Sequence, residues 1–381
     1  MTSKTYEVPR LDLKGSSYEI GLQHGQLLAP QILDQLSIYR ELFRQACKFE
    51  WAHVRTVADE FRAGIDPLAP DLLEEMKGIA DGVQKAKTST ASADEVVVDV
   101  LDIIALNARS EIALGQWDDG CTSLAWHIRT PGTEKQILAQ NWDWREAVGK
   151  NLAMVSIERV GKPKIWMVTE PGIVGKIGFN SQSVGVCLNA IRARPISTSL
   201  LPIHLLLRIA LESDSVDSAI ATFEKLGGAA SSQHILIADA NGGRGLELSP
   251  RGGVYLREDS NGIVTHTNHF LENMLMDEPP WLSGSPIRLE RAKTICEELI
   301  GELGLARLGE VDAKLLRARF FSDTFNSPQA ICCSPDPNRD ARIQTLFNIV
   351  MSFAPEREPS AEVVFGKPGS GEESSVYRMP W

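Results

Sequence analysis

The chain has 381 residues, 43% of them apolar and 23% charged, which is typical of a folded protein with one large domain or two smaller ones. Its formal charge of −11 argues against general binding to nucleic acid or acidic membranes, because both require a basic surface. The first residues lack the pattern of a secretory signal, and Asp99 and Asp102 interrupt the most apolar stretch, Val96 to Leu106. We therefore expect neither a signal peptide nor a membrane-spanning helix.

Six cysteines are scattered along the chain without C-x-x-C spacing, which fits neither a disulfide framework nor a zinc site. We expect reduced thiols, most of them buried, in a protein that stays inside the cell. The six are Cys47, Cys121, Cys187, Cys296, Cys332 and Cys333.

The first 115 residues have helical periodicity. A capping box, Ser16-x-x-Glu19, precedes a segment whose apolar residues follow helical spacing from Ile20 to Phe43. Pro70 is typical of the first position of a second helix, with apolar residues in register to position 83. A third helix is predicted over 93–106.

Beyond Cys121 the periodicity changes to that of strands. Short β-prone runs separated by turn dipeptides predict an antiparallel meander, helical spacing returns, and strands resume. This order favours an α+β fold with two antiparallel sheets between helical layers. The tail after residue 355 is predicted to be loosely ordered, apart from an edge strand at Val363-Val364-Phe365. The predicted strands are 124–128, 136–142, 152–159, 164–169, 235–239, 245–248, 263–266 and 346–353, and the predicted helical segments are 201–226 and 286–302.

The dipeptide Gly120-Cys121 lies at the junction between helices and strands. Gly120 lacks a Cβ atom, so it can adopt a strained backbone conformation and the neighbouring sulfur can approach its carbonyl closely. Attack of the sulfur on this carbonyl would form a thioester, and hydrolysis would leave Cys121 as a new chain start. Its free α-amine, with a reference pKa of about 7.7–8.0, could then take the thiol proton. The alternative interpretation is a buried structural cysteine.

Several further motifs extend beyond this junction: DDGCTS (118–123), AQNWDW (139–144), TEPGIVGKIGFNSQSVGV (169–186), GLELSP (245–250), HTNH (266–269) and TLFNI (345–349). Together they resemble the isopenicillin N acyltransferase family, over about residues 10 to 365. The resemblance implies the N-terminal-nucleophile (Ntn) hydrolase fold, an αββα sandwich. It also implies cleavage into a helical segment, 1–120, and a second fragment, 121–381, that remain associated as one domain.

By the same resemblance, Cys121 is the nucleophile in self-cleavage and in turnover, Asp143 lies near the α-amine, and Asn268 donates to the oxyanion. Arg342 corresponds to an active-site arginine that could hold Asp143 or a substrate carboxylate. Ser123 and Ser249 correspond to supporting hydroxyl positions. Alanine occupies position 341, where the penicillin enzymes have a serine.

Three functions agree with these residues. The first is transfer of an acyl group from a donor such as a coenzyme A thioester to a small-molecule amine. The second is an amidohydrolase that uses water instead, and the third is an inactive relative that only binds ligands. No cofactor is expected, nor a metal, because His266 and His269 have no partner at ligand spacing. The glycines of 172–178 predict a turn rather than a nucleotide loop. The final residues, Met379-Pro380-Trp381, are no peroxisomal signal, so we expect a cytoplasmic enzyme.

Overall fold

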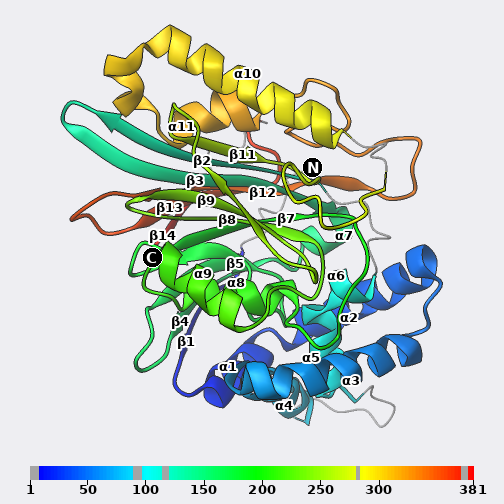
Figure 1. The fold of residues 1–381 in the computed structure, drawn as a ribbon. Helices are drawn as coiled ribbons and strands as arrows, with labels where there is room; N and C mark the ends of the chain where they lie inside the picture. The colour runs from blue at the N-terminus through cyan, green and yellow to red at the C-terminus, as the bar shows by residue number, and fades with distance from the viewer. Residues whose placement is uncertain (1–7, 89–96, 114–119, 280–283, 370–375) are drawn as a thin grey trace, which may run out of the picture.

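Two β-sheets lie face to face, with helices on the outer side of each (Figure 1). The computed structural model describes residues 8–88, 97–113, 120–279, 284–369 and 376–381. The main hydrophobic core fills the space between the sheets, and a second core lies between the six-stranded sheet and the long helix α10. The layering is the αββα sandwich that the sequence predicted.

The six-stranded sheet has the order β11-β2-β3-β12-β13-β14, and all its neighbouring strands are antiparallel. Val363-Val364-Phe365 lies in β13, between β12 and β14, so the prediction of an edge strand in a loosely ordered tail was wrong. The strands are β2 (Gly120–Thr130), β3 (Thr133–Arg145), β11 (Ile263–His266), β12 (Ile343–Phe353), β13 (Ser360–Phe365) and β14 (Val376–Met379).

The eight-stranded sheet has the order β1-β4-β5-β6-β7-β8-β9-β10. Its pairs are antiparallel except β1 with β4, where the N-terminal strand joins the edge in parallel. The first four predicted strands therefore form two hairpins in different sheets rather than one meander. The strands are β1 (Arg10–Lys14), β4 (Ala153–Glu158), β5 (Ile165–Thr169), β6 (Ile177–Asn180), β7 (Gly185–Ala190), β8 (Gln233–Asp239), β9 (Gly242–Leu248) and β10 (Val254–Arg257).

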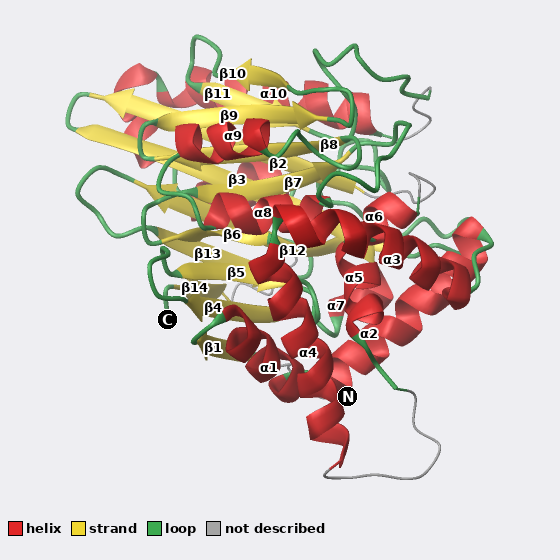
Figure 2. Cartoon of the chain, turned by 60° about the horizontal axis from the view of Figure 1, so that its bottom comes forward, coloured by secondary structure: helices red, strands yellow, loops and turns green. Residues whose placement is uncertain are grey.

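Helices α8 and α9 cover the outer face of the eight-stranded sheet, and the N-terminal helices gather at the same side (Figure 2). The capping box at Ser16 is present, but the segment from Ile20 to Phe43 forms two helices, because Pro30 occupies the first turn of the second. Residues 93–96 of the third predicted helix lie outside the described residues. The helices on this side are α1 (Ser17–Leu27), α2 (Ala29–Leu42), α3 (Trp51–Leu68), α4 (Pro70–Thr88), α5 (Val100–Asn107), α6 (Arg109–Ile112), α8 (Ile203–Leu211) and α9 (Val216–Lys225).

The outer side of the six-stranded sheet is covered by α10 (Ser285–Leu303), which packs on β2 and β11, and by the short α11 (Ala313–Leu316). A further single turn, α7 (Glu146–Gly149), follows β3. Short π-helical and 3-10 segments cover Phe43–Cys47, Leu305–Glu310 and Arg317–Phe321. Within the described ranges, no helix is both long and apolar enough to cross a membrane. All six cysteines are buried thiols outside any disulfide.

Candidate active site

The first residues of β2 place Gly120 and Cys121 on opposite faces of the six-stranded sheet. Cys121 pairs directly with Trp142 of β3, and Gly120 pairs with Asp143. Because side chains alternate along a strand, the Cys121 side chain enters the core between the two sheets, while Asp143 faces the side of α10. Cys121 is only 2% exposed, so its thiol lies in a nearly dry site. Asp118 and Asp119 of the DDGCTS motif lie outside the described residues.

Gly120 is required by the close approach of Asp143. A Cβ atom at position 120 would lie 2.8 Å from Asp143 Oδ2 and 3.2 Å from its Cβ. Space beside Asp143 is therefore one reason for glycine at this position. Thr345, on the other neighbouring strand, donates its hydroxyl to Asp143 Oδ1 at 2.6 Å. The carboxylate is thus held directly against the residue that precedes Cys121.

Asn268 holds the other side of the same peptide bond. Its Oδ1 accepts the backbone N–H of Cys121 at 2.9 Å, and its Nδ2 donates to the carbonyl of Ala190 at 3.0 Å. Asn268 is fully buried, and Ser285 at the start of α10 accepts its backbone N–H. The structure therefore brings together Gly120, Cys121, Asp143 and Asn268.

Arg288 is a member of this site that the sequence did not reveal. Its Nη1 donates to the carbonyl oxygen of Cys121 at 2.6 Å, and its Nη2 donates to Asn268 Oδ1 at 2.8 Å. Two donors at Oδ1 and an acceptor at Nδ2 fix the orientation of the Asn268 amide. Arg288 is 4% exposed although it lies in the first turn of an otherwise amphipathic helix, a position that gives no sign of this role.

Glu247 of the GLELSP motif anchors the loop that carries Asn268. This fully buried carboxylate accepts from His266 Nε2 at 2.9 Å and from the backbone N–H groups of residues 271–273. It thereby ties both ends of the loop that carries Asn268. Burial alone would raise the pKa of Glu247, but the His266 hydrogen bond and charge, together with the backbone donors, hold it below its ordinary value. The sequence signal was an acidic residue within an apolar strand.

The two predicted supporting serines have different surroundings. Ser123 faces the inter-sheet core, where its hydroxyl donates to Asn189 Oδ1 at 2.7 Å, and Asn189 in turn donates to the Cys121 carbonyl at 3.2 Å. Ser249 closes the turn after β9, where it donates to the carbonyl of Gly252 at 2.8 Å. The structure thus joins Ser123, but not Ser249, to the network around Cys121.

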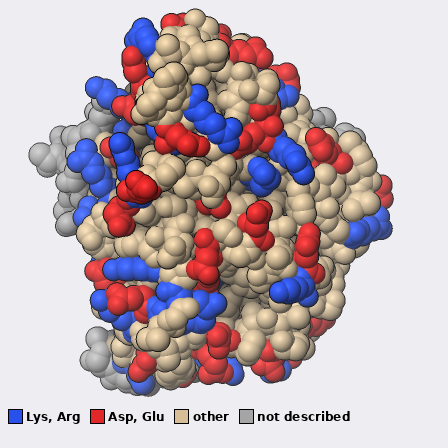
Figure 3. All heavy atoms as spheres, turned by 60° about the vertical axis from the view of Figure 1, so that its left-hand side comes forward, with Lys and Arg blue, Asp and Glu red and all other residues tan. Residues whose placement is uncertain are grey.

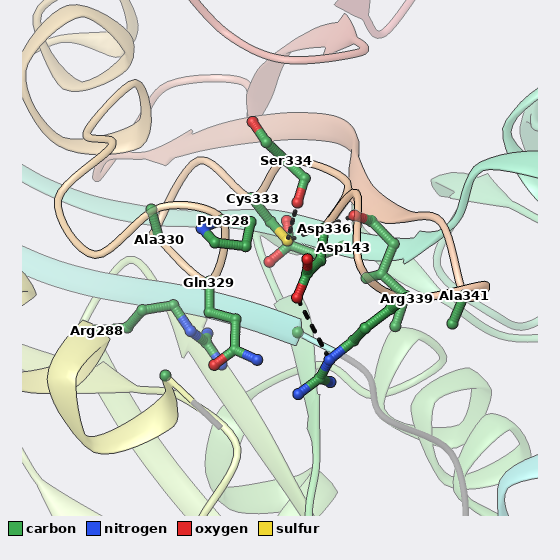
Figure 4. Close-up of a pocket in the computed structure, with 13 residues that line it drawn as sticks. Asp143, Arg288, Pro328, Gln329, Ala330, Cys333, Ser334, Asp336, Arg339 and Ala341 are labelled. Carbon is green, nitrogen blue, oxygen red and sulfur yellow. Dashed lines mark hydrogen bonds and ion pairs between the residues drawn. The ribbon is translucent and has the colours of Figure 1, made fainter. Parts of the chain in front are cut away.

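Arg342 lies away from this network. Its side chain is 65% exposed and forms an ion pair with Glu146, which raises its pKa. A cavity of about 530 Å³, its open mouth included, instead has Asp143, Arg288 and Arg339 in its lining. Figure 4 shows Asp143 between Arg288 on one side and Arg339 on the other. Gly120, Cys333 and Ala341 also line this cavity.

The surface of the molecule has no single dominant charge on the face that Figure 3 shows, where acidic and basic side chains are interspersed. Within the part of the chain that the structure describes, no group of three or more His, Cys, Asp or Glu side chains could hold a metal ion. The polar groups of the site are the Cys121 thiol, the Asp143 carboxylate, the Asn268 amide and the Arg288 guanidinium.

Comparison with known proteins identifies the family. The family model described as "Acyl-coenzyme A:6-aminopenicillanic acid acyl-transferase" matches residues 129–369. The acyl-coenzyme A:6-aminopenicillanic-acid-acyltransferase 40 kDa form of Emericella nidulans is 32% identical over 365 residues, which cover 95% of this chain and 94% of that relative. The chain belongs to this acyl-transferase family.

Solved structures with lower similarity were also found. An N-acylethanolamine-hydrolyzing acid amidase ortholog from Caenorhabditis elegans is 17% identical with a TM-score of 0.42, and covers 68% of this chain and 100% of its own. A variant of the conjugated bile acid hydrolase from Clostridium perfringens is 12% identical with a TM-score of 0.39, and covers 68% and 92%. The two stacked sheets between helical layers make the chain an αββα sandwich, and its membership of the acyl-transferase family supports an enzyme.

Proposed function

We propose that the chain cleaves itself between Gly120 and Cys121 and then transfers an acyl group through a thioester on Cys121. The observation that carries this proposal is the peptide bond between these two residues. Asp143 lies against its glycine side, Asn268 Oδ1 binds its nitrogen, and a buried thiol follows it. A structural cysteine at a strand start would need neither the bare glycine nor two polar side chains on one buried peptide.

In the first step the Cys121 sulfur attacks the Gly120 carbonyl carbon, the peptide C–N bond breaks, and the nitrogen leaves as an amine. Water then hydrolyses the thioester and frees Gly120 as a carboxylate. Asn268 Oδ1, which accepts from this nitrogen before cleavage, is placed to hold the new amine afterwards. An oxyanion role of Asn268 remains a prediction about the acylated enzyme, because its Nδ2 here donates to Ala190.

In turnover the α-amine of Cys121 serves as base for its own thiol. The acyl donor is a thioester, such as an acyl-coenzyme A, or an amide, and the acceptor is a small-molecule amine. The name of the Emericella nidulans relative supports this pairing of donor and acceptor. The cavity between Arg288 and Arg339 reaches Gly120 and Asp143, which makes it the place where we expect the substrate to bind.

The fragments 1–120 and 121–381 should remain associated after cleavage. Residues of α1 to α5 and of both sheets share one continuous hydrophobic core. Separating the fragments would expose this apolar surface to water, at about 25 cal/mol for each Å². We therefore expect one complex of two chains rather than a free helical fragment.

Intact-mass spectrometry of the purified protein tests the proposal. The 41.9 kDa chain should divide into fragments of roughly 13 and 29 kDa by share of residues, the larger beginning at Cys121. Cys121→Ala should remain at full length, while Cys187→Ala, a second buried thiol, should be cleaved as the wild type is. A new N-terminus at any other residue, or cleavage of Cys121→Ala, would contradict the mechanism.

A panel of acyl-coenzyme A thioesters and N-acyl amines, with and without acceptor amines, then distinguishes the two enzymatic functions. Acyl transfer predicts an N-acylated product whose yield rises with the amine concentration. Hydrolysis predicts free acid at a rate that the amine does not change. Cleaved protein that turns over neither class would favour a relative that only binds ligands.

A further inference from the structure

Self-cleavage as proposed above has a proton-transfer problem. Before cleavage, the nitrogen of Cys121 belongs to a peptide bond and donates its hydrogen to Asn268 Oδ1, so it cannot act as a base. The α-amine becomes available only after the bond is broken. Another group must accept the thiol proton in the uncleaved chain, and it must lie on the inner face of the sheet, where the thiol points.

Lys176 occupies this face. It is fully buried at the end of the glycine-containing turn before β6, and its Nζ lies 3.7 Å from the centre of the Trp142 ring. Trp142 is the direct cross-strand partner of Cys121, and directly opposite residues project their side chains to the same side. Burial lowers the pKa of Lys176, and a negative charge on Cys121 is the smallest of the influences that oppose this lowering. The amine and the thiol therefore share one dry compartment.

Around Glu170, the buried positive charges outnumber the negative ones. Lys176 Nζ donates to Glu170 Oε1 at 2.7 Å, and Arg109 Nη2 donates to the same oxygen at 2.6 Å. Two buried cations thus share one carboxylate, whose other oxygen accepts from Tyr39 and Gln35. A thiolate at Cys121 would supply a second negative charge and balance the pair of cations.

The other titratable groups nearby are held in their neutral forms. Burial lowers the pKa of His204, which contacts Arg109, well below its ordinary value. Burial raises the pKa of Cys187 and of Tyr39 well above theirs. Lys176 differs, since burial lowers its pKa to about 8, near neutrality, even though Glu170 opposes that change.

We propose that Lys176 is the base of self-cleavage. Its neutral amine accepts the proton from Cys121 Sγ, and the thiolate attacks the Gly120 carbonyl carbon. As the C–N bond breaks, a proton passes to the departing nitrogen, which regenerates the neutral lysine and leaves the thioester for hydrolysis by water. Once the α-amine exists it takes over as base, so Lys176 is needed for maturation more than for turnover.

The test follows self-cleavage of freshly translated, pulse-labelled chain at pH 6 to 10. Wild-type cleavage should be first order and should accelerate as the pH rises through about 8, where Lys176 becomes neutral. Lys176→Met, which is neutral and similar in volume, should slow cleavage by at least about 100-fold. Lys176→Arg keeps the positive charge but cannot accept a proton near neutral pH, so it should be equally slow.

Lys164→Met is the matched control. Lys164 also lies over a tryptophan ring, that of Trp166 at 5.3 Å, but its side chain is 34% exposed and it pairs with Glu158. This variant should be cleaved at the wild-type rate. Circular dichroism and the melting temperature show whether each variant is folded. Lys176→Arg keeps a cation beside Glu170, and so provides a folded variant if the neutral one is unstable.

The same experiment separates this inference from the proposed function. Failure of the wild type to cleave at Cys121 would contradict the proposed function itself. Normal cleavage of folded Lys176→Met, or of Lys176→Arg with the wild-type pH profile, would overturn only the role of Lys176. Material of either variant that has finally matured should retain kcat within about tenfold of the wild type, because the α-amine then serves as base. An equal loss of maturation rate and kcat would indicate a structural role and refute the inference.

Discussion

The two faces of the hairpin formed by β2 and β3 differ in what they offer to chemistry. On the inner face, Cys121 and Trp142 lie in a closed core beside Lys176, and a chain of hydrogen bonds runs from Ser123 to Asn189. On the outer face, Asp143 borders a cavity that a small molecule can enter. The thiol therefore lies on one face of the hairpin, while the open cavity lies on the other.

In the proposed mechanism, the scissile peptide lies at the first pair of the hairpin. There a single peptide bond joins a residue of the outer face, Gly120, to a residue of the inner face, Cys121. Farther along β2, the outer positions Leu124 and Trp126 are packed under α10, so a small molecule could not reach them. Cleavage would disconnect the chain of segment 1–120 from the hairpin at this point, while both fragments stay associated, and would leave the hairpin ladder beyond Cys121 intact.

Gly120→Ala should have the largest effect, on the rate of self-cleavage. It alters the outer face of the hairpin and leaves the inner face unchanged. The added Cβ would meet Asp143 Oδ2 at 2.8 Å, which is too close, so the carboxylate or the peptide must move. A displacement of this size near the reacting atoms should slow self-cleavage by at least about 100-fold. The rate is measured by mass spectrometry on the pulse-labelled chain.

Gly301→Ala provides the control for this substitution. Gly301 lies within α10, and a Cβ atom there would have no neighbour within 4 Å. It should leave cleavage unchanged and stabilise the helix by about 0.5–1 kcal/mol. If Gly120→Ala is cleaved as fast as the wild type, the close contact with Asp143 has no part in maturation.

Glu247→Gln should have an intermediate effect, on the free energy of unfolding. Glu247 lies in β9 of the eight-stranded sheet, opposite the inner face of the hairpin. The substitution removes a charged acceptor from a fully buried hydrogen-bond network, which costs about 1–3 kcal/mol, and glutamine keeps the volume and one acceptor. The folded pKa of Glu247 lies below its ordinary value of 4.5. Its contribution is therefore complete above about pH 4.5 and is lost as the pH falls through the lower, folded pKa.

Urea unfolding of wild type and Glu247→Gln at several pH values measures this difference. The gap in unfolding free energy should be widest at neutral pH and should shrink below pH 4.5. Glu224→Gln is the control, because Glu224 is an exposed residue of α9 that accepts from the hydroxyl of Tyr255. A gap that grows on acidification would contradict the assignment of Glu247 as the buried anion.

The sequence predicted most of the elements because their signals are local. The capping box at Ser16 and the proline at position 70 each act within a few residues. The sequence pattern could not predict which of the two sheets each hairpin joins, because a hairpin has the same periodicity in either sheet. The parallel pairing of β1 with β4 joins segments more than 140 residues apart, and no local pattern records it.

The same limit applies to the site. Cys121, Asp143 and Asn268 stand in recognisable motifs, whereas Arg288 contacts Cys121 across 167 residues from within an ordinary amphipathic helix. Lys176 and Glu247 were visible as charged residues in otherwise apolar runs. Their partners, Trp142 and the loop after His266, come together only when the sheets stack.

Arg342→Ala should show the smallest effect, because this residue belongs to neither face of the hairpin. An exposed ion pair is screened by water and salt, so we expect self-cleavage and kcat/KM to change by less than about twofold. Glu146→Gln breaks the same ion pair from its other side and should be equally silent. If Arg342→Ala lost activity while Glu146→Gln did not, the guanidinium would have to turn toward Asp143 or the substrate during turnover. That result would add the predicted arginine to the outer face, and it would show that the cavity closes around its substrate.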